Sequence, residues 1–223
     1  MNAKTRRIAV NVGSQFIPGM NSVFAGVALA AAELDWEVVG IRNGFAGLLD
    51  PDDFPDGGLV DLSPTLLHGL DRGASGLLGQ SSQFDPFHRR QEDEDGMLVE
   101  VDRTDDLLAA FKEHGIDALV SVAGGRSLSV LYKLHRKGLN AVCIPRSVEN
   151  DIATTMVSFG FNTALSVTIE MLDRAHQAAT SSGQIGVVEV PGEHAGWLAL
   201  QSGIATGADV ILIPEVPIDF DAV

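Results

Sequence analysis

The chain has 223 residues, of which 45% are hydrophobic, and a formal net charge of −15 at pH 7. This length can bury one sizeable core or two modest ones. The acidic balance argues against nucleic acid or an anionic membrane as a bulk partner, because both require a basic face. The single cysteine, Cys143, excludes a disulfide within the chain, and there is no basic leader and no apolar run of about 18 residues. We therefore expect a soluble cytoplasmic protein.

The first part of the chain is predicted to form a βαβ unit. Residues 7–13 are an apolar run typical of a buried parallel strand. Residues 18–34 contain a helix rich in alanine, valine and leucine, and residues 37–41 are a second strand. Residues 50–100 are the least regular part, and their acidic run, residues 91–96, is predicted to be a solvated loop.

Helices and strands alternate regularly after residue 100. Helices are predicted at residues 105–114, 127–137, 158–179 and 193–206, and strands at residues 117–122, 140–144, 184–190 and 209–213. Such alternation implies a doubly wound, mostly parallel α/β sheet with helices on both faces. We predict a first α/β domain at residues 1–150, followed at residues 151–223 by a linking helix and the incomplete beginning of a second domain.

Two loops at the carboxyl ends of strands are suited to a phosphate donor, because ligands bind at that edge of such sheets. Residues 13–21 present backbone N–H groups at a strand-to-helix turn. Residues 122–127 combine two glycines, which let a ligand approach the backbone, with Arg126 as a cation and a serine suited to cap the next helix. Plain turns that pack a helix on the sheet account for either loop as well. The candidate donor-loop residues are Ser14, Gly124, Gly125 and Ser127.

The most polar loop at a strand end spans residues 145–151. Glu149 and Asp151 stand two residues apart beside Arg146 and Ser147. Together they can supply a general base and further polar contacts to a ligand. Helix capping and a chain reversal explain the same residues equally well.

A fourth loop, residues 190–196, contains glycines that permit a close turn into a helix. Glu193 near that helix start is electrostatically favourable without any further function. None of the six histidines has the partner spacing of a zinc site. No metal-holding residue is therefore predicted.

In order and in spacing, these loops resemble the phosphofructokinase family over essentially the whole chain. Residues 18–21 match its P-G-M-N motif, and residues 41–48 resemble I-x-x-G-[YF]-x-G-L. Residues 147–152 match the T-[IV]-D-N-D segment, residues 159–164 resemble G-F-x-T-A, and residues 187–190 resemble V-V-E-V. The resemblance implies phosphoryl transfer to fructose 6-phosphate in glycolysis, from ATP or pyrophosphate with Mg²⁺. It also implies a homo-oligomer, or a hetero-oligomer with a homologue.

The resemblance assigns a role to each candidate. Glu149 would be the base that takes the proton from the sugar hydroxyl, and Asp151 a supporting acid. Ser147 would contact the sugar phosphate, and Arg126 and Arg146 would contact phosphate groups.

Several family motifs are altered in ways that remove positive or metal-binding groups. Gly125 stands where G-G-D-G-S has its magnesium aspartate, and Gly192 and Glu193 belong to a segment that replaces the sugar-gripping M-G-R. Phosphoryl transfer depends on positioning and on cations that neutralise the transferring group. The alternative interpretation is therefore a catalytically inactive homologue that binds a phosphorylated metabolite or regulates a partner enzyme.

Overall fold

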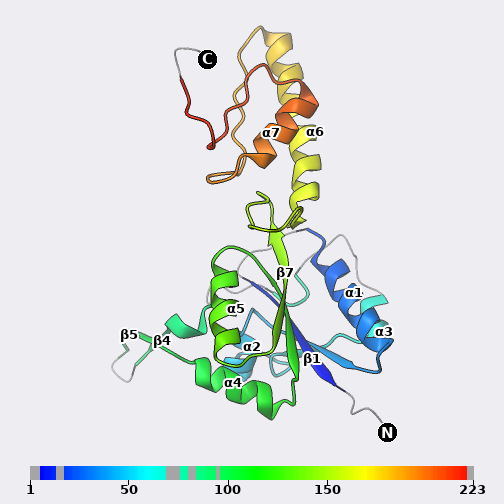
Figure 1. Cartoon of the computed structure of the whole chain (residues 1–223), viewed down its shortest axis with the longest axis vertical. Coiled ribbons are helices and arrows are strands. Elements are labelled where there is room, and N and C mark those ends of the chain that lie inside the picture. Colours follow the sequence, from blue (N-terminus) through cyan, green and yellow to red (C-terminus); the bar gives the residue numbers. More distant parts are fainter. Residues whose placement is uncertain (1–5, 14–17, 69–75, 80–83, 94–95, 220–223) are drawn as a thin grey trace. The chain divides into compact units, whose positions relative to one another are not determined.

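The computed structural model describes residues 6–13, 18–68, 76–79, 84–93 and 96–219. The chain divides into two compact units, Met1–Ile144 and Pro145–Val223. Unit 1 consists of strands flanked by helices, and unit 2 is built mainly on two helices (Figure 1).

The strands form a six-stranded sheet in the order β3-β2-β1-β6-β7-β8. β1 pairs in parallel with β2 and with β6, β7 pairs in parallel with β8, and β3 runs antiparallel to β2. The mostly parallel sheet predicted from the sequence is confirmed. The strand bounds are β1 Arg7–Val12, β2 Glu37–Ile41, β3 Leu59–Asp61, β6 Ala118–Ala123, β7 Ala141–Ser147 and β8 Phe159–Gly160.

Helices cover both faces of the sheet in unit 1. Figure 1 shows α1 (Met20–Ala32) and α3 (Pro64–His68) on one side, and α2 (Ala46–Leu49), α4 (Thr104–Glu113) and α5 (Arg126–Arg136) on the other. The second group shares one apolar core, whose burial stabilises the fold by about 25 cal/mol per Å². Its helical members include Leu48, Leu49, Leu107, Phe111, Val130, Leu131 and Leu134.

Short elements occupy the stretch that was predicted to be irregular. Besides β3 and α3 they are η1 (Pro51–Asp53), η2 (Pro86–His88) and an antiparallel hairpin of β4 (Arg89–Glu92) with β5 (Leu98–Val101). The loop predicted at residues 91–96 is therefore wrong at Gln91 and Glu92, which lie in β4, although both are exposed. β4 consists of charged and amide residues and is mostly exposed, so its sequence resembles a loop.

Strand β7 continues through Pro145, where the sequence predicted it to end. Arg146 and Ser147 extend the strand and pair with Phe159 and Gly160 of β8. Proline removes one N–H from a ladder but is tolerated where that group is not needed. The longer strand carries the chain directly into the most polar loop.

In unit 2, α6 (Phe161–Ser182) packs against α7 (Trp197–Thr206) (Figure 1). α6 is bounded by Gly160 and Gly183, which have φ values of 99° and 63° that glycine adopts without steric cost. α7 begins later than the predicted residue 193, because the chain first turns through Gly196, whose N–H donates to Glu215 Oε1 at 2.8 Å. Within the described ranges, no helix is long and apolar enough to cross a membrane.

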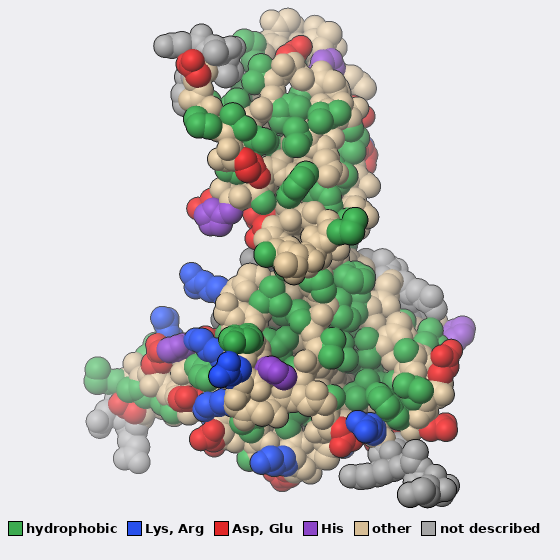
Figure 2. All heavy atoms as spheres, viewed as in Figure 1, with side chains coloured by type: hydrophobic (Ala, Val, Ile, Leu, Met, Phe, Trp, Pro, Cys, Tyr) green, Lys and Arg blue, Asp and Glu red, His purple; other side chains and the backbone are tan. Residues whose placement is uncertain are grey.

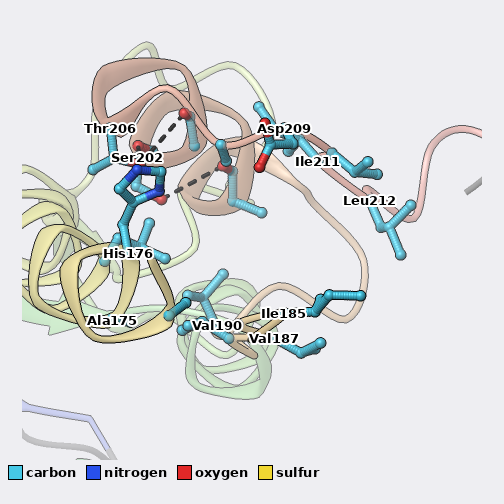
Figure 3. A pocket seen from close by; sticks show the side chains of 18 of the residues that line it. Ala175, His176, Ile185, Val187, Val190, Ser202, Thr206, Asp209, Ile211 and Leu212 are labelled. Carbon is cyan, nitrogen blue, oxygen red and sulfur yellow. Dashed lines mark hydrogen bonds between the residues drawn. The ribbon is translucent and has the colours of Figure 1, made fainter. Parts of the chain in front are cut away.

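The two strands predicted in unit 2 are not formed. Among the described residues, neither 184–190 nor 209–213 pairs as a strand. Instead they border an apolar groove of about 520 Å³, with Ile185 and Val187 on one side and Leu212 on the other (Figure 3). A strand requires a hydrogen-bonded neighbour, and an apolar pattern alone does not supply one. Ile185 and Val187 are accordingly 94% and 90% exposed.

Candidate functional site

The loop after β7 is held together by its own side chains. Ser147 Oγ donates to an Asp151 carboxylate oxygen at 2.5 Å and accepts the Glu149 N–H at 3.1 Å. Asp151 is exposed and Glu149 is half-buried. One serine hydroxyl therefore connects the two acidic residues that the sequence singled out.

Asn150 ties the same loop to the chain that leads into β8. Its backbone is left-handed, with φ 56°, and its Nδ2 donates to the Met156 carbonyl at 3.0 Å. Its Oδ1 accepts the Ser158 N–H at 2.8 Å, and the Ser158 hydroxyl lies 2.9 Å from the Ser147 carbonyl oxygen. Sequence reasoning missed Asn150 and Ser158. The available signal was an asparagine directly after a candidate base, since asparagine tolerates the left-handed region.

Glu149 lines an open cleft of about 670 Å³ in unit 2. The structure thus brings together the loop at residues 145–151 and the loop at residues 190–196. About 40 residues, most of which form α6, separate the two loops in the sequence. Gly192 is required in this cleft: its φ is 151°, and a Cβ there would lie 2.8 Å from the Ala195 carbonyl oxygen. The lining residues are Glu149, Glu189, Val190, Pro191, Gly192 and Glu193.

The cleft is strongly acidic, because glutamates line it and no lysine or arginine of the described residues does. The sequence of unit 2 contains two arginines and no lysine against ten carboxylate side chains. Arg174 pairs with Glu170 on α6, and Arg146 is only 4% exposed and does not line the cleft. In the view of Figure 2, lysine and arginine side chains gather on unit 1. A phosphate entering this cleft would meet negative charge.

The predicted donor loop of unit 1 is the turn from β6 into α5. Gly124 is half-buried, and Gly125 adopts φ 51° immediately before the helix. Arg126 is exposed as the first residue of α5. An exposed guanidinium beside two glycines is accessible to an anion.

Ser127 has a different place from the one predicted for it. Gly125, which has no side chain, occupies the cap position, and Ser127 is the second residue of α5, 3% exposed. The hydroxyl faces the end of β1, where a Cβ on Gly13 would lie 2.7 Å from Ser127 Oγ. The expected helix cap is therefore wrong, and Ser127 instead packs closely against Gly13, whose lack of a Cβ leaves room for the hydroxyl. Ser14, the remaining donor-loop candidate, lies outside the described residues.

No group of three or more His, Cys, Asp or Glu side chains within the described ranges is arranged to hold a metal ion. The candidate site therefore offers the half-buried Glu149 carboxylate, which lies on a hydrogen-bonded loop and lines an open cleft. Such a carboxylate can accept a proton from a bound hydroxyl.

Residues 7–223 match the family model described as Phosphofructokinase. The chain is 37% identical over 219 residues to the ATP-dependent 6-phosphofructokinase 2 of Clostridium perfringens. It is 36% identical over 218 residues to the pyrophosphate–fructose 6-phosphate 1-phosphotransferase of Amycolatopsis methanolica. These alignments cover 98% and 97% of this chain but 58% and 59% of the relatives, so the chain spans less than two thirds of their length.

Solved structures give the same fold. A phosphofructokinase from Saccharomyces cerevisiae is 28% identical, with a TM-score of 0.72 over 95% of this chain and 29% of that one. A pyrophosphate-dependent phosphofructokinase from Nitrosospira multiformis is 24% identical, with a TM-score of 0.71 over 96% of this chain and 54% of that one. The second similarity concerns the fold alone.

Proposed function

Because this chain belongs to the phosphofructokinase family, we propose that it transfers a phosphoryl group from ATP or pyrophosphate to the 1-hydroxyl of fructose 6-phosphate. One observation carries the proposal. Glu149, in the segment that resembles T-[IV]-D-N-D, lines a single open cleft with Gly192 and Glu193, which stand in place of the sugar-gripping motif. The segment assigned to the base and the segment that stands in place of the sugar-gripping motif thus line the same cleft.

In the proposed reaction, the Glu149 carboxylate takes the proton of the sugar 1-hydroxyl. The hydroxyl oxygen forms a bond to the terminal phosphorus of the donor, and the bond from that phosphorus to ADP or to the second phosphate breaks. A positioned general base typically contributes 10²- to 10⁴-fold to the rate. Asp151 supports the loop through its hydrogen bond to Ser147.

The phosphate groups need positive or N–H partners. We assign this role to Arg126 and to the backbone around Gly124 and Gly125 for the donor, and to the Ser147 hydroxyl for the sugar phosphate. Arg146, the other expected phosphate contact, is 4% exposed and does not line the cleft, so no contact in the cleft is assigned to it. Mg²⁺ is usually held by one or two carboxylates together with substrate phosphates. Residues 122–127 contain no carboxylate, and the Asp151 carboxylate already accepts the Ser147 hydroxyl. Residues 122–127 and Asp151 therefore do not fit the role of holding Mg²⁺. The proposed reaction is accordingly described without a metal-dependent step.

A coupled assay for fructose 1,6-bisphosphate tests the proposal, run with ATP and with pyrophosphate, each with Mg²⁺. Turnover is expected with one donor and is expected to be lost in Glu149→Gln, which keeps the shape of the side chain but removes its basicity. Glu170→Gln is the matched control, since Glu170 lies on α6 in an exposed pair with Arg174. Full activity of Glu149→Gln would exclude Glu149 as the base.

The acidity of the cleft favours a second candidate, a catalytically inactive homologue that binds a phosphorylated metabolite or regulates a partner enzyme. No lysine or arginine among the described residues lines the cleft to neutralise a transferring phosphoryl group. Absence of turnover with both donors, together with measurable binding of a sugar phosphate or a homologous enzyme, would select this candidate.

The remaining proposals follow from the family. We propose that residues 151–223 begin a sugar-phosphate domain, joined by α6 to a first domain at residues 1–150. We also propose that the protein acts in the cytoplasm as a homo-oligomer or with a homologue. Size measurement in solution, with and without a full-length relative, tests the assembly.

A further inference from the structure

We infer that Asn150 is the positioning residue for Glu149: its left-handed backbone and its side-chain bonds to Met156 and Ser158 fix where the Glu149 backbone presents its carboxylate. The catalytic consequence of this inference rests on the proposed function. The structural part stands on hydrogen bonds within unit 2.

The backbone of Asn150 reverses the chain directly after Glu149. Its φ of 56° lies in the left-handed region, which is sterically unfavourable for most non-glycine residues. Asparagine is among the few residues that occupy this region readily. The residue type at position 150 therefore matches the turn that points the preceding carboxylate into the cleft.

The Asn150 side chain uses both ends of its amide. Nδ2 donates to the Met156 carbonyl at 3.0 Å, and Oδ1 accepts the Ser158 N–H at 2.8 Å. These bonds join the loop after β7 to the segment that enters β8. An aspartate can reproduce only the accepting half, and a glycine reproduces neither.

Ser158 anchors this connection in the protein. Its side chain is buried, at 2% exposed, and its hydroxyl lies within hydrogen-bond distance of the Ser147 carbonyl oxygen (2.9 Å) and of Asn150 Oδ1 (3.1 Å). On the other side, the Glu149 N–H donates to Ser147 Oγ at 3.1 Å. The Glu149 backbone is thus held by its own N–H bond to Ser147 and by Asn150, whose side chain is hydrogen-bonded to Met156 and Ser158.

Two variants separate the backbone role of Asn150 from its side-chain role. Asn150→Gly retains access to the left-handed turn and deletes both side-chain bonds. Asn150→Asp retains the acceptor for the Ser158 N–H and loses the donation to Met156. The matched control is Asn43→Gly, an asparagine with φ 45° in unit 1.

Amide hydrogen exchange of the full chain tests the structural part. In Asn150→Gly, the Ser158 and Glu149 amides are expected to exchange at least about tenfold faster, because the loop opens locally without global unfolding. Asn150→Asp is expected to lie in between, and Asn43→Gly to leave both amides unchanged. Unchanged Ser158 and Glu149 exchange in Asn150→Gly would overturn the inference.

Kinetics test the catalytic part and distinguish the inference from the proposed function. If the wild-type chain turns over, Asn150→Gly is expected to lower kcat by about 100-fold with little change in KM, since a misplacement of about 1 Å has that cost. Asn150→Asp should recover part of kcat. An unchanged kcat would overturn the inference while the proposed function stood. Absence of wild-type turnover would remove the proposed function, and the exchange rates would then decide the inference alone.

Discussion

The Ser147 hydroxyl donates its proton to the Asp151 carboxylate at 2.5 Å while its oxygen accepts the Glu149 N–H at 3.1 Å. The group that the sequence predicts as a contact to a sugar phosphate is therefore already used inside its own loop. A phosphate that takes the Ser147 proton must displace Asp151. The Ser147–Asp151 hydrogen bond can consequently be exchanged for one to a ligand, while the Asn150 bonds to Met156 and Ser158 still hold the loop backbone.

The first prediction concerns this hydroxyl. Ser147→Ala removes both bonds and is expected to lower the free energy of unfolding by about 1 kcal/mol. Ser147→Thr keeps the hydroxyl and is expected to lose less than half as much. Urea unfolding of both variants measures the difference. Equal losses would show that the hydroxyl bonds contribute nothing to the loop.

The second prediction concerns the charge of the cleft. If the acceptor carries a phosphate, Glu193→Gln removes one repulsion and should tighten fructose 6-phosphate binding a few-fold. Glu193→Arg adds a charge-assisted bond and should tighten binding by about tenfold, equivalent to about 1.4 kcal/mol. Titration calorimetry at low and high salt measures the effect, which should shrink with salt because Glu193 is exposed. Equal affinity of all three proteins would place the phosphate elsewhere.

The third prediction concerns backbone strain. Thr154 is exposed and left-handed, with φ 64°, a conformation that is unfavourable for a β-branched residue. Thr154→Gly relieves this strain but also makes the unfolded chain more flexible. The net expectation is a gain of about 0.5 kcal/mol in the free energy of unfolding. Thr155→Gly, whose φ is not positive, is the control and should lose stability in the same thermal melts.

The fourth prediction concerns pH. Hydrogen bonds from the Thr104 side chain, and then from its backbone N–H, hold the pKa of Asp102 below its usual value of 3.8. Because the folded pKa is lowered, this stabilisation is present above about pH 4 and is lost as the pH falls through the folded value. Asp102→Asn should therefore lower stability at pH 7, with a difference from wild type that narrows towards pH 3.

Asp102 is 53% exposed in its side chain, so solvent screening keeps the expected loss at pH 7 to about 0.5 kcal/mol. Thr104→Val removes the side-chain hydrogen bond that lowers the pKa of Asp102 most. In a protein that carries Thr104→Val, the loss of stability caused by Asp102→Asn should therefore depend less on pH. Urea unfolding across the pH range measures both. A difference that stays constant between pH 7 and pH 3 would contradict this account.

The longer strands and helices of unit 1 were predicted well because their signals are local, whereas the short elements between residues 46 and 101 were not predicted. β1 and β6 are predominantly apolar, with Asn11 and Ser121 as buried polar exceptions, as is typical of strands buried on both faces. In unit 2 the same kind of signal at residues 184–190 predicted a strand that is not formed. That segment has the apolar side chains of a strand but lacks, among the described residues, a hydrogen-bonded neighbour.

The candidate site shows the same division. Glu149 and Glu193 could each be singled out from the residues around them, because the order and spacing of the short motifs identify their positions even where the residue type differs. The bond from Ser158 to Asn150 could not be predicted, since it depends on how seven intervening residues fold back.

By itself, the sequence determined the family, the parallel α/β fold and the acidic character of the second unit, because these follow from composition, periodicity and short motifs. Only the tertiary structure decided that Glu149 and Glu193 line one cleft and that Asp151 engages Ser147. The physical reason is that such contacts join residues whose proximity arises from packing of α6 and reversal of the loop after β7. Neither of these leaves a pattern in neighbouring residues.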